Sequence, residues 1–304
     1  MIEVVAEPFS GSLLEALEAA PDDGAVRAYW LGQAGFVLAH RRTRVVIDPY
    51  LSDSLALKYA STEFAHRRLA PPPIAPAALT GIALVLCTHR HSDHMDPGTL
   101  PALALANPGT PIGVPAAERD RALAMGLAPA ALHPLEAGEV VRLGGVTVEA
   151  LASAHEELAP DAQGRHPFLG YAIDLGGLKL YHSGDCVPYP GLAEQLSALR
   201  VEVALLPVNG RDAYRKSRGV PGNFHLQEAI ALCRAAGVGV LVGHHYGLFE
   251  FNTIDPSAAR AALARASDLE GRLAPADGAL RFARARATDR HGRGPEGASG
   301  PREA

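Results

Sequence analysis

The stretch 84–97 constrains the fold of this chain more than any other part of it. An apolar run ends there in four imidazole and carboxylate side chains within six residues, His89, His91, Asp93 and His94. Burying such groups without partners costs free energy, and both types are common ligands of zinc, manganese and iron ions. Alternation along a strand would bring His89, His91 and Asp93 to one face, and a turn after Asp93 would bring His94 round. The stretch therefore predicts a metal site at a strand end.

Composition limits the classes of protein to which this chain can belong. Its 304 residues are 48% hydrophobic and 20% charged, as in a globular protein with a sizeable core. The net charge of −5 gives no electrostatic case for a nucleic-acid partner. We expect no membrane-spanning helix, because no run of about 18 apolar residues occurs. We expect no signal peptide, because the N-terminus lacks a basic stretch followed by an apolar one. The cysteines, Cys87, Cys186 and Cys233, are odd in number and widely spaced, which favours a reducing, cytoplasmic setting.

The order of apolar and amphipathic segments predicts an α/β fold in a single domain over 1–285. Residues 286–304 are rich in Arg, Gly, Pro and Glu, and we expect a disordered tail there. The expected strands are 25–31, 35–39, 43–48, 82–87, 111–115, 139–143, 146–152, 169–175, 178–182, 201–208 and 239–245. The expected helices are 10–20, one that starts directly after Asp96-Pro97, 116–125, 192–199, 224–235 and one from Pro256 to about Asp268.

Three segments keep two interpretations open. The Gly-x-x-Gly at 32–35 resembles a phosphate cradle, but a strand rather than a helix follows it, so a hairpin turn is favoured. Asp48, at the end of a strand, is either a turn former or a buried group that supports the site. The long connection 51–80 carries aromatic and basic residues and is either a functional flap or a solvated loop.

Three further strands end in metal-ligand residues, His155, Asp185 and His245. Strand ends hold side chains rigidly, and several of them converge on one edge of a sheet. Together with the first cluster they supply seven donors, and Asp185 is able to bridge two ions. Two ions about 3.5–4 Å apart would hold a hydroxide between them and polarise the bond to be cleaved.

The motifs together resemble the metallo-β-lactamase fold superfamily over 25–285. The resemblance rests on Trp30-Leu-Gly-x-x-Gly35, Thr88-His-x-His-x-Asp-His-x-Asp96, Tyr181-His-Ser-Gly-Asp185 and His244-His245 with Asp255-Pro256. These motifs are similar to the branch that contains L-ascorbate-6-phosphate lactonase. The resemblance implies a four-layer αβ/βα sandwich with the metal ions at one edge between two sheets.

The resemblance also implies a ligand set. One ion takes His89, His91 and His155, the other takes Asp93, His94 and His245, and Asp185 bridges them. His244 remains an alternative to His245. His182 is either a hydrogen-bonded support for the site or a core histidine. The histidine-rich set favours one or two zinc ions, and manganese or iron(II) stays open.

The loop 209–225 is the other informative segment. Arginine forks suit phosphate or carboxylate, so the loop is either a clamp for an anionic substrate or a solvated basic loop. His225 has Glu228 three residues later, where a Ser or Thr cap would be usual, and this makes His225 a candidate substrate contact. The candidate substrate-binding residues are Asn209, Arg211, Tyr214, Arg218 and His225, beside the further cations Arg215 and Lys216.

We therefore expect a metal-dependent hydrolase in which a metal-held hydroxide attacks a small anionic ester or lactone. The candidate catalytic residues are Asp93 as a proton shuttle, Asp185 as the bridge, and Tyr246 or Asn209 as donors to the oxyanion. The rivals are a phosphodiesterase or phospholipase D-like hydrolase on the same ions and a non-catalytic metal-binding protein. A di-iron redox protein is disfavoured, because His91 stands where such proteins carry glutamate. The sequence leaves a homo-oligomer open.

Overall fold

The computed structural model describes residues 2–9 and 11–284, so the expected tail at 286–304 lies outside the described residues. Two mixed sheets face each other. The first has the order β1 (Ile2–Pro8), β15 (Gly278–Arg284), β2 (Val26–Gly32), β3 (Gly35–His40), β4 (Thr43–Ile47), β5 (Leu84–Leu86), β6 (Ile112–Pro115) and β7 (Leu132–Leu135). The second has the order β14 (Glu270–Leu273), β13 (Val240–His244), β12 (Val203–Pro207), β11 (Leu178–His182), β10 (Leu169–Leu175), β9 (Val146–Ala152) and β8 (Val140–Leu143).

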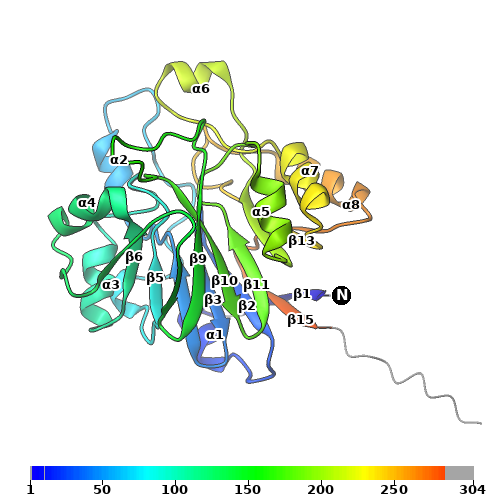
Figure 1. Cartoon of the computed structure of the whole chain (residues 1–304), viewed down its shortest axis with the longest axis horizontal. Helices are drawn as coiled ribbons and strands as arrows, with labels where there is room; N and C mark the ends of the chain where they lie inside the picture. The colour runs from blue at the N-terminus through cyan, green and yellow to red at the C-terminus, as the bar shows by residue number, and fades with distance from the viewer. Residues whose placement is uncertain (1, 10, 285–304) are drawn as a thin grey trace, which may run out of the picture.

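Helices cover the outer face of each sheet (Figure 1). On the first sheet lie α1 (Leu13–Ala19), α3 (Leu100–Ala106) and α4 (Arg119–Ala124), with short 3₁₀ turns η1 (Pro76–Ala78) and η2 (Ala116–Glu118). On the second lie α5 (Leu192–Ala198), α7 (Leu226–Ala236) and α8 (Pro256–Arg265). Two short helices, α2 (Ser54–Lys58) and α6 (Ala213–Ser217), lie at one end of the sandwich. This arrangement confirms the predicted four-layer αβ/βα sandwich.

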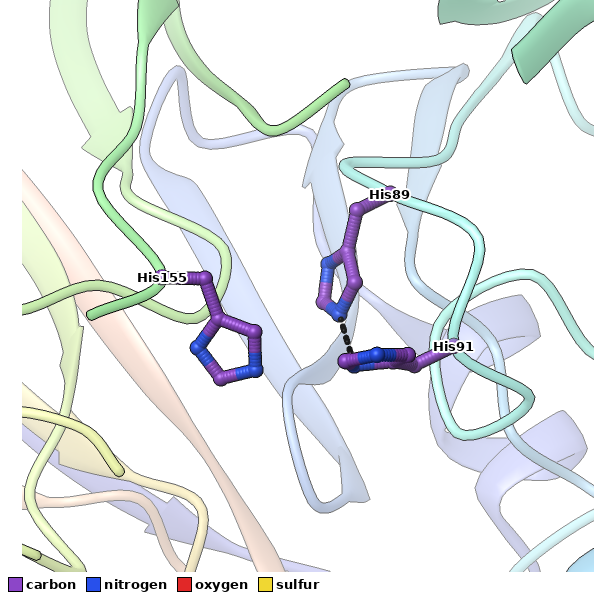
Figure 2. Close-up of side chains that lie close together, drawn as sticks. All are labelled: His89, His91 and His155. Carbon is purple, nitrogen blue, oxygen red and sulfur yellow. Dashed lines mark hydrogen bonds between the residues drawn. The ribbon is translucent and has the colours of Figure 1, made fainter. Parts of the chain in front are cut away.

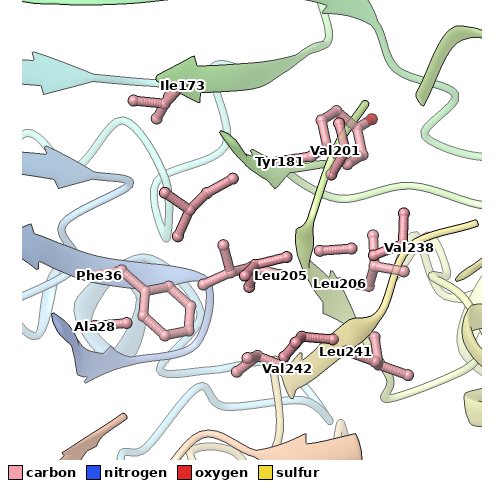
Figure 3. Packing of buried hydrophobic residues seen from close by; sticks show 14 of the residues in the cluster. Ala28, Phe36, Ile173, Tyr181, Val201, Leu205, Leu206, Val238, Leu241 and Val242 are labelled. Atoms are coloured by element: carbon pink, nitrogen blue, oxygen red, sulfur yellow. The ribbon is translucent and has the colours of Figure 1, made fainter. Parts of the chain in front are cut away.

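Alternation along the strands explains why both faces of each sheet are buried. In β2, Ala28 and Trp30 face the core between the sheets, whereas Tyr29 and Leu31 face the helices of the outer layer. The inner core includes Phe36 and residues of β12 and β13 such as Leu205 and Val242 (Figure 3). Each fully buried side chain of this size stabilises the fold by roughly 1.5–3 kcal/mol.

Strand direction gathers the ends of several strands at one edge. β9 and β11 both run antiparallel to β10 and therefore share a direction. β11, β12 and β13 are parallel neighbours, so the ends of β9, β11 and β13 meet on the same side of their sheet. No helix among the described residues is long and apolar enough to cross a membrane.

Several predicted boundaries were wrong. β5 ends at Leu86, so His89, His91 and Asp93 lie on turns rather than alternating along a strand. The helix expected directly after Asp96-Pro97 begins at Leu100, because the Asp96 carboxylate accepts from the Gly98 amide and the Thr99 hydroxyl and holds a turn first. The last helix ends at Arg265 rather than near Asp268.

Four strands, β1, β7, β14 and β15, are absent from the predicted set. β1 and β15 pair with each other over their whole lengths although they come from opposite ends of the described chain. Such pairing depends on the folded chain, because every residue of β1 is exposed or only half-buried and the strand has no strong apolar pattern of its own.

Candidate metal centre

The metal-ligand side chains of the first motif lie on a tight loop that follows β5. The His91 carbonyl accepts hydrogen bonds from the amides of His94 and Met95, at 2.9 and 2.8 Å, and this turn folds the loop back on itself. His89 and His94 are fully buried, and a ring nitrogen of His89 lies 2.9 Å from one of His91. Figure 2 shows that the His155 ring, from the end of β9, faces the same space.

Seven side chains converge into three overlapping groups whose ligand atoms lie within 4.8 Å of one another. The groups are His89/His91/His155, His89/His94/Asp185 and Asp93/His94/His245. Asp185 lies between the outer two groups. Its Oδ1 is 3.3 Å from Nε2 of both His94 and His245, and its Oδ2 is 3.8 Å from Nε2 of His155. One oxygen therefore faces each side of the cluster, which is the geometry that a bridging ligand requires.

Unpaired buried atoms test whether these residues fit a metal. Nε2 of His94, both ring nitrogens of His155 and Oδ1 of Asp185 are buried without a hydrogen-bond partner. Each such group costs roughly 1–3 kcal/mol when it is left unpaired, and a divalent ion would supply the missing partner. The donor set of imidazole and carboxylate thus fits one or two divalent ions.

Lowered pKa values keep two histidines of the cluster in the neutral form that can bind a cation. Burial, helped by the neighbouring His155, lowers the pKa of His91 to about 4, so its ring is neutral at pH 7. Burial and the neighbouring histidines His94 and His91 likewise hold the pKa of His89 well below its usual range. Neutral imidazoles offer lone pairs, which is the form that binds a metal.

Asp48 is a buried group that supports the metal-ligand residues, which is one of the two interpretations left open by the sequence. Its buried carboxylate accepts from the Thr88 amide at 2.7 Å, from the Thr88 hydroxyl at 2.6 Å and from His94 Nδ1 at 2.7 Å. Because the Thr88 hydroxyl donates to Asp48, its oxygen is left to accept from His89 Nδ1 at 3.1 Å. These bonds use Nδ1 of both histidines and so direct Nε2 of each toward the cluster.

Gln33 is a site residue that the sequence reasoning missed. Its Nε2 donates to Asp93 Oδ2 at 3.1 Å, and its backbone carbonyl accepts from the His245 amide at 2.9 Å. It lies in the turn between β2 and β3, and its side chain is fully buried. The Gly-x-x-Gly motif marks this position, but treating the motif as a hairpin alone left its polar residue without a role.

Backbone conformation distinguishes the roles of His244 and His245 at the end of β13. His245 adopts a φ of +64°, and it belongs to the cluster. His244 stacks on His182 instead, with ring centroids 4.9 Å apart. His182 accepts from the Gly184 amide at 3.0 Å and donates to the Ala34 carbonyl at 2.8 Å, so it supports the loop that carries Asp185.

A cavity of about 330 Å³ opens over the cluster. Its floor includes His91, Asp93, His155, Asp185 and His245, and its walls come from residues 55–66 and 218–221. Among the predicted substrate contacts, Arg218 lines this cavity. Tyr214 lies beside Arg218 and donates to Glu63 on the facing wall.

The other predicted contacts do not line this cavity. Arg211 is paired with Glu228 at 2.6 Å, and the His225 amide bonds to the same carboxylate. Asn209 donates to Asn252, a lining residue, at 2.7 Å. The Tyr246 hydroxyl donates to the Ala274 carbonyl, and its ring stacks on Trp30 along a different cavity.

Comparison with known proteins agrees with this architecture. Residues 43–246 match the family described as the beta-lactamase superfamily domain. The UPF0173 metal-dependent hydrolase of Myxococcus xanthus is 28% identical over 268 residues, which cover 86% of this chain and 85% of that protein. The UPF0173 metal-dependent hydrolase of Polynucleobacter asymbioticus is 28% identical over 231 residues, which cover 66% of this chain and 75% of that protein.

Solved structures share the fold at low sequence identity. The isothiocyanate hydrolase from Delia radicum gut bacteria superposes with a TM-score of 0.64 at 19% identity, covering 84% of this chain and 98% of that one. The metallo hydrolase Igni18 from Ignicoccus hospitalis superposes with a TM-score of 0.60 at 18% identity. The match covers 86% of this chain and 100% of that one. The chain therefore belongs to the beta-lactamase superfamily, within the part of it that holds metal-dependent hydrolases.

Proposed function

We propose that this chain hydrolyses a small ester or lactone that carries a negative charge, with one or two divalent ions held in the cluster. His89, His91 and His155 would hold one ion. Asp93, His94 and His245 would hold the second, with Asp185 between the two groups. The observation that carries the proposal is the convergence of these seven side chains, several with unpaired buried atoms, on the floor of a cavity.

Bound divalent ions would lower the pKa of a water molecule to about 7 and stabilise charge that develops on the substrate. The chain's own residues supply orientation and proton transfer. Asp93 faces the cavity with 17% of its side chain exposed, and Gln33 holds one of its oxygens. In the proposed reaction the acyl C–O bond breaks, hydroxyl joins the acyl carbon, and Asp93 takes the remaining proton of the water and passes it to the leaving alkoxide.

Zinc is the ion that we propose, since histidine dominates the set, with manganese or iron(II) as alternatives. A cytoplasmic location is supported by Cys87, Cys186 and Cys233, which are buried free thiols. The cation Lys58 on the cavity lining supports a substrate with a negative charge.

The test combines metal analysis with a panel of lactones, phosphodiesters and thioesters. We expect wild-type protein to retain one or two ions and to hydrolyse an ester or lactone fastest. His89→Ala should lower both ion content and rate, whereas His133→Ala, outside the cluster, should change neither. Equal rates for wild type and His89→Ala would refute the proposal. Fastest turnover of a phosphodiester would instead support a phosphodiesterase or phospholipase D-like hydrolase.

A further inference from the structure

The charge on the cavity walls points to the chemical class of the substrate. The segment 209–225 carries the cations Arg211, Arg215, Lys216 and Arg218, and each of them has a carboxylate partner. These partners are Glu228, Asp212, Glu156 and Glu63, at 2.6, 2.5, 2.6 and 2.6 Å. A carboxylate beside a guanidinium cancels most of its positive charge, so such a guanidinium attracts a phosphate less than an unpaired one does.

Arg218 is the decisive member, since it alone of the four lines the cavity. Its Nε donates to Glu63, its guanidinium lies 3.7 Å from the centre of the Tyr214 ring, and Tyr214 donates to the same carboxylate. The Arg218–Glu63 pair therefore presents almost no net charge to the cavity. Lys58 is the other cation on the lining, and it is exposed at the rim.

Aromatic rings from the segment that carries Glu63 also line the cavity, and the Phe64 ring meets the Tyr214 ring with centroids 6.0 Å apart. Phe64 stacks on Phe251 with ring centroids 4.6 Å apart, and His66 stacks on Tyr59 at 4.5 Å. The His66 ring also makes T-shaped contacts with the rings of Phe249 and Phe251, with centroids 5.0 and 4.8 Å apart. These contacts fix Phe64 and His66 as rigid flat surfaces, and offset stacking on such surfaces favours another flat ring.

His66 adds one polar feature to this wall without adding charge. Its Nδ1 lies 2.6 Å from the Phe64 carbonyl oxygen, and a carbonyl can only accept, so Nδ1 carries the proton. Nε2 is then a hydrogen-bond acceptor. Burial lowers the pKa of His66, which keeps the ring neutral at pH 7.

We propose that the substrate is an ester or lactone whose larger substituent is flat and apolar, and that a phosphorylated substituent is disfavoured. This inference rests on the proposed function and narrows its anionic substrate to one that carries at most a single charge. The cavity of about 330 Å³ lies at the small end of the range for small-molecule sites, which suits a single ring beside the scissile group.

The first experiment measures kcat/KM of the zinc-loaded protein for three γ-butyrolactones, each corrected for its rate with free hydroxide. The three are the 4-phenyl compound, the unsubstituted compound and the 4-(phosphooxymethyl) compound. We expect the phenyl compound to exceed both others by about tenfold, the value of a partly buried ring. Highest kcat/KM for the phosphorylated compound would overturn the inference.

A binding experiment separates this inference from the proposed function. Titration calorimetry of the zinc-loaded protein compares 3-phenylpropanoate with 3-sulfopropanoate. Both carry a carboxylate for the metal ions, and a sulfonate is a weak metal ligand, so they differ at the remote end. We expect the phenyl compound to bind about tenfold more tightly. If neither an ester nor a lactone is hydrolysed, the proposed function fails, and this comparison still supports or overturns the inference.

Two variants test the walls directly. Phe64→Leu keeps an apolar side chain but removes the flat face, and should reduce the phenyl preference severalfold. Leu57→Ala, an 80% exposed position on α2 outside the lining, serves as the control and should leave the preference unchanged. Glu63→Gln releases the Arg218 guanidinium and should strengthen 3-sulfopropanoate binding severalfold. If Glu63→Gln bound 3-sulfopropanoate no more tightly than wild type does, the argument that Glu63 neutralises Arg218 would be contradicted.

Discussion

Three of the six described non-glycine residues with a positive φ lie at the metal cluster or support it. Gln33, Asp48 and His245 adopt φ values of 48°, 45° and 64°, which only glycine visits without cost. Each of the three makes a hydrogen bond that places a cluster residue, and His245 bonds through its amide to the Gln33 carbonyl. Strained residues persist when surrounding contacts over-determine them, and they concentrate at functional sites. The strain thus marks the residues that orient the ligands.

Asp48→Asn tests the support behind His94. Asparagine tolerates a positive φ, so the backbone should be kept. Thr88 and His94 present three donors to the Asp48 carboxylate. The asparagine side chain would replace one of the two acceptor oxygens by a donor. We expect zinc affinity to fall by about 10–100-fold, measured by competition with a chelating dye. Asp174→Asn, an exposed position on β10, is the control, and equal affinities would contradict the assigned role.

Gln33→Met tests the donor that holds Asp93. The variant keeps the side-chain length but leaves Asp93 Oδ2 without its hydrogen bond. We expect kcat to fall at least tenfold with a smaller change in KM, because the bond positions a proton-transfer group rather than the substrate. Gln195→Met on the exposed face of α5 should leave both constants unchanged. A rise in KM alone would show that Gln33 contacts the substrate instead.

At the level of elements, each ligand loop follows a strand, and its first ligand comes one to three residues after the end of β5, β9, β11 or β13. The sheets therefore hold the framework rigidly, while the ligands themselves lie on short loops. The substrate walls differ in construction, because they come from α2 with its following loop and from the loop after α6. This division leaves the walls free to vary among proteins that share the metal site.

A buried arginine joins β1, β2 and the loop before β2. Arg27 is 4% exposed and pairs with Glu7 at 2.7 Å and with Asp23 at 2.9 Å. Hydrogen bonds from Arg27 and, less strongly, from Arg281 hold the pKa of Asp23 well below its usual range. Asp23 thus contributes stability that is fully present above its unfolded pKa of about 3.9 and is lost as pH falls through its depressed folded pKa.

Arg27→Met should therefore lower the free energy of unfolding by about 2 kcal/mol at neutral pH, the value of hydrogen bonds to charged groups. Urea titrations from pH 7 to pH 3 measure the difference from wild type. We expect the difference in unfolding free energy between wild type and variant to stay constant down to about pH 5. The difference should shrink below about pH 4, as Asp23 takes up its proton. A difference that grows as pH falls would contradict the sign of this linkage.

At the level of the whole molecule, the metal cluster joins the two sheets. Its residues come from the loop after β5 in the first sheet and from the ends of β9, β11 and β13 in the second. Bound metal should therefore stabilise the sandwich as a unit. The pairing of β1 with β15 joins the two ends of the described chain at one edge of the first sheet.

Removal of metal should lower the melting temperature. Zinc at 100 times its dissociation constant stabilises a folded protein by about 2.7 kcal/mol, and each kcal/mol shifts Tm by about 2–4 °C in a large domain. We expect chelation to lower Tm by about 5–10 °C and zinc to restore it, as followed by calorimetry. Asp185→Asn should lose most of this shift, and a wild-type Tm that is indifferent to zinc would contradict metal binding by the cluster.

The residue types and their spacing already predict the metal site. His89 to His94 are dense enough to indicate ligands without a structure, and His155, Asp185 and His245 follow recognisable strand patterns. These signals are local, because strand periodicity and ligand chemistry are properties of short segments. The same local information predicts the family and the four-layer sandwich through the motif order.

The folded chain alone shows how distant residues pair. Glu63 and Arg218 are 155 residues apart, and their contact changes Arg218 from a candidate anion clamp into one half of a neutral wall. Gln33 reaches Asp93 across 60 residues, and a backbone angle separates His245 from His244. Pairing and side-chain direction depend on which loops meet in space, and no short-range pattern carries that information.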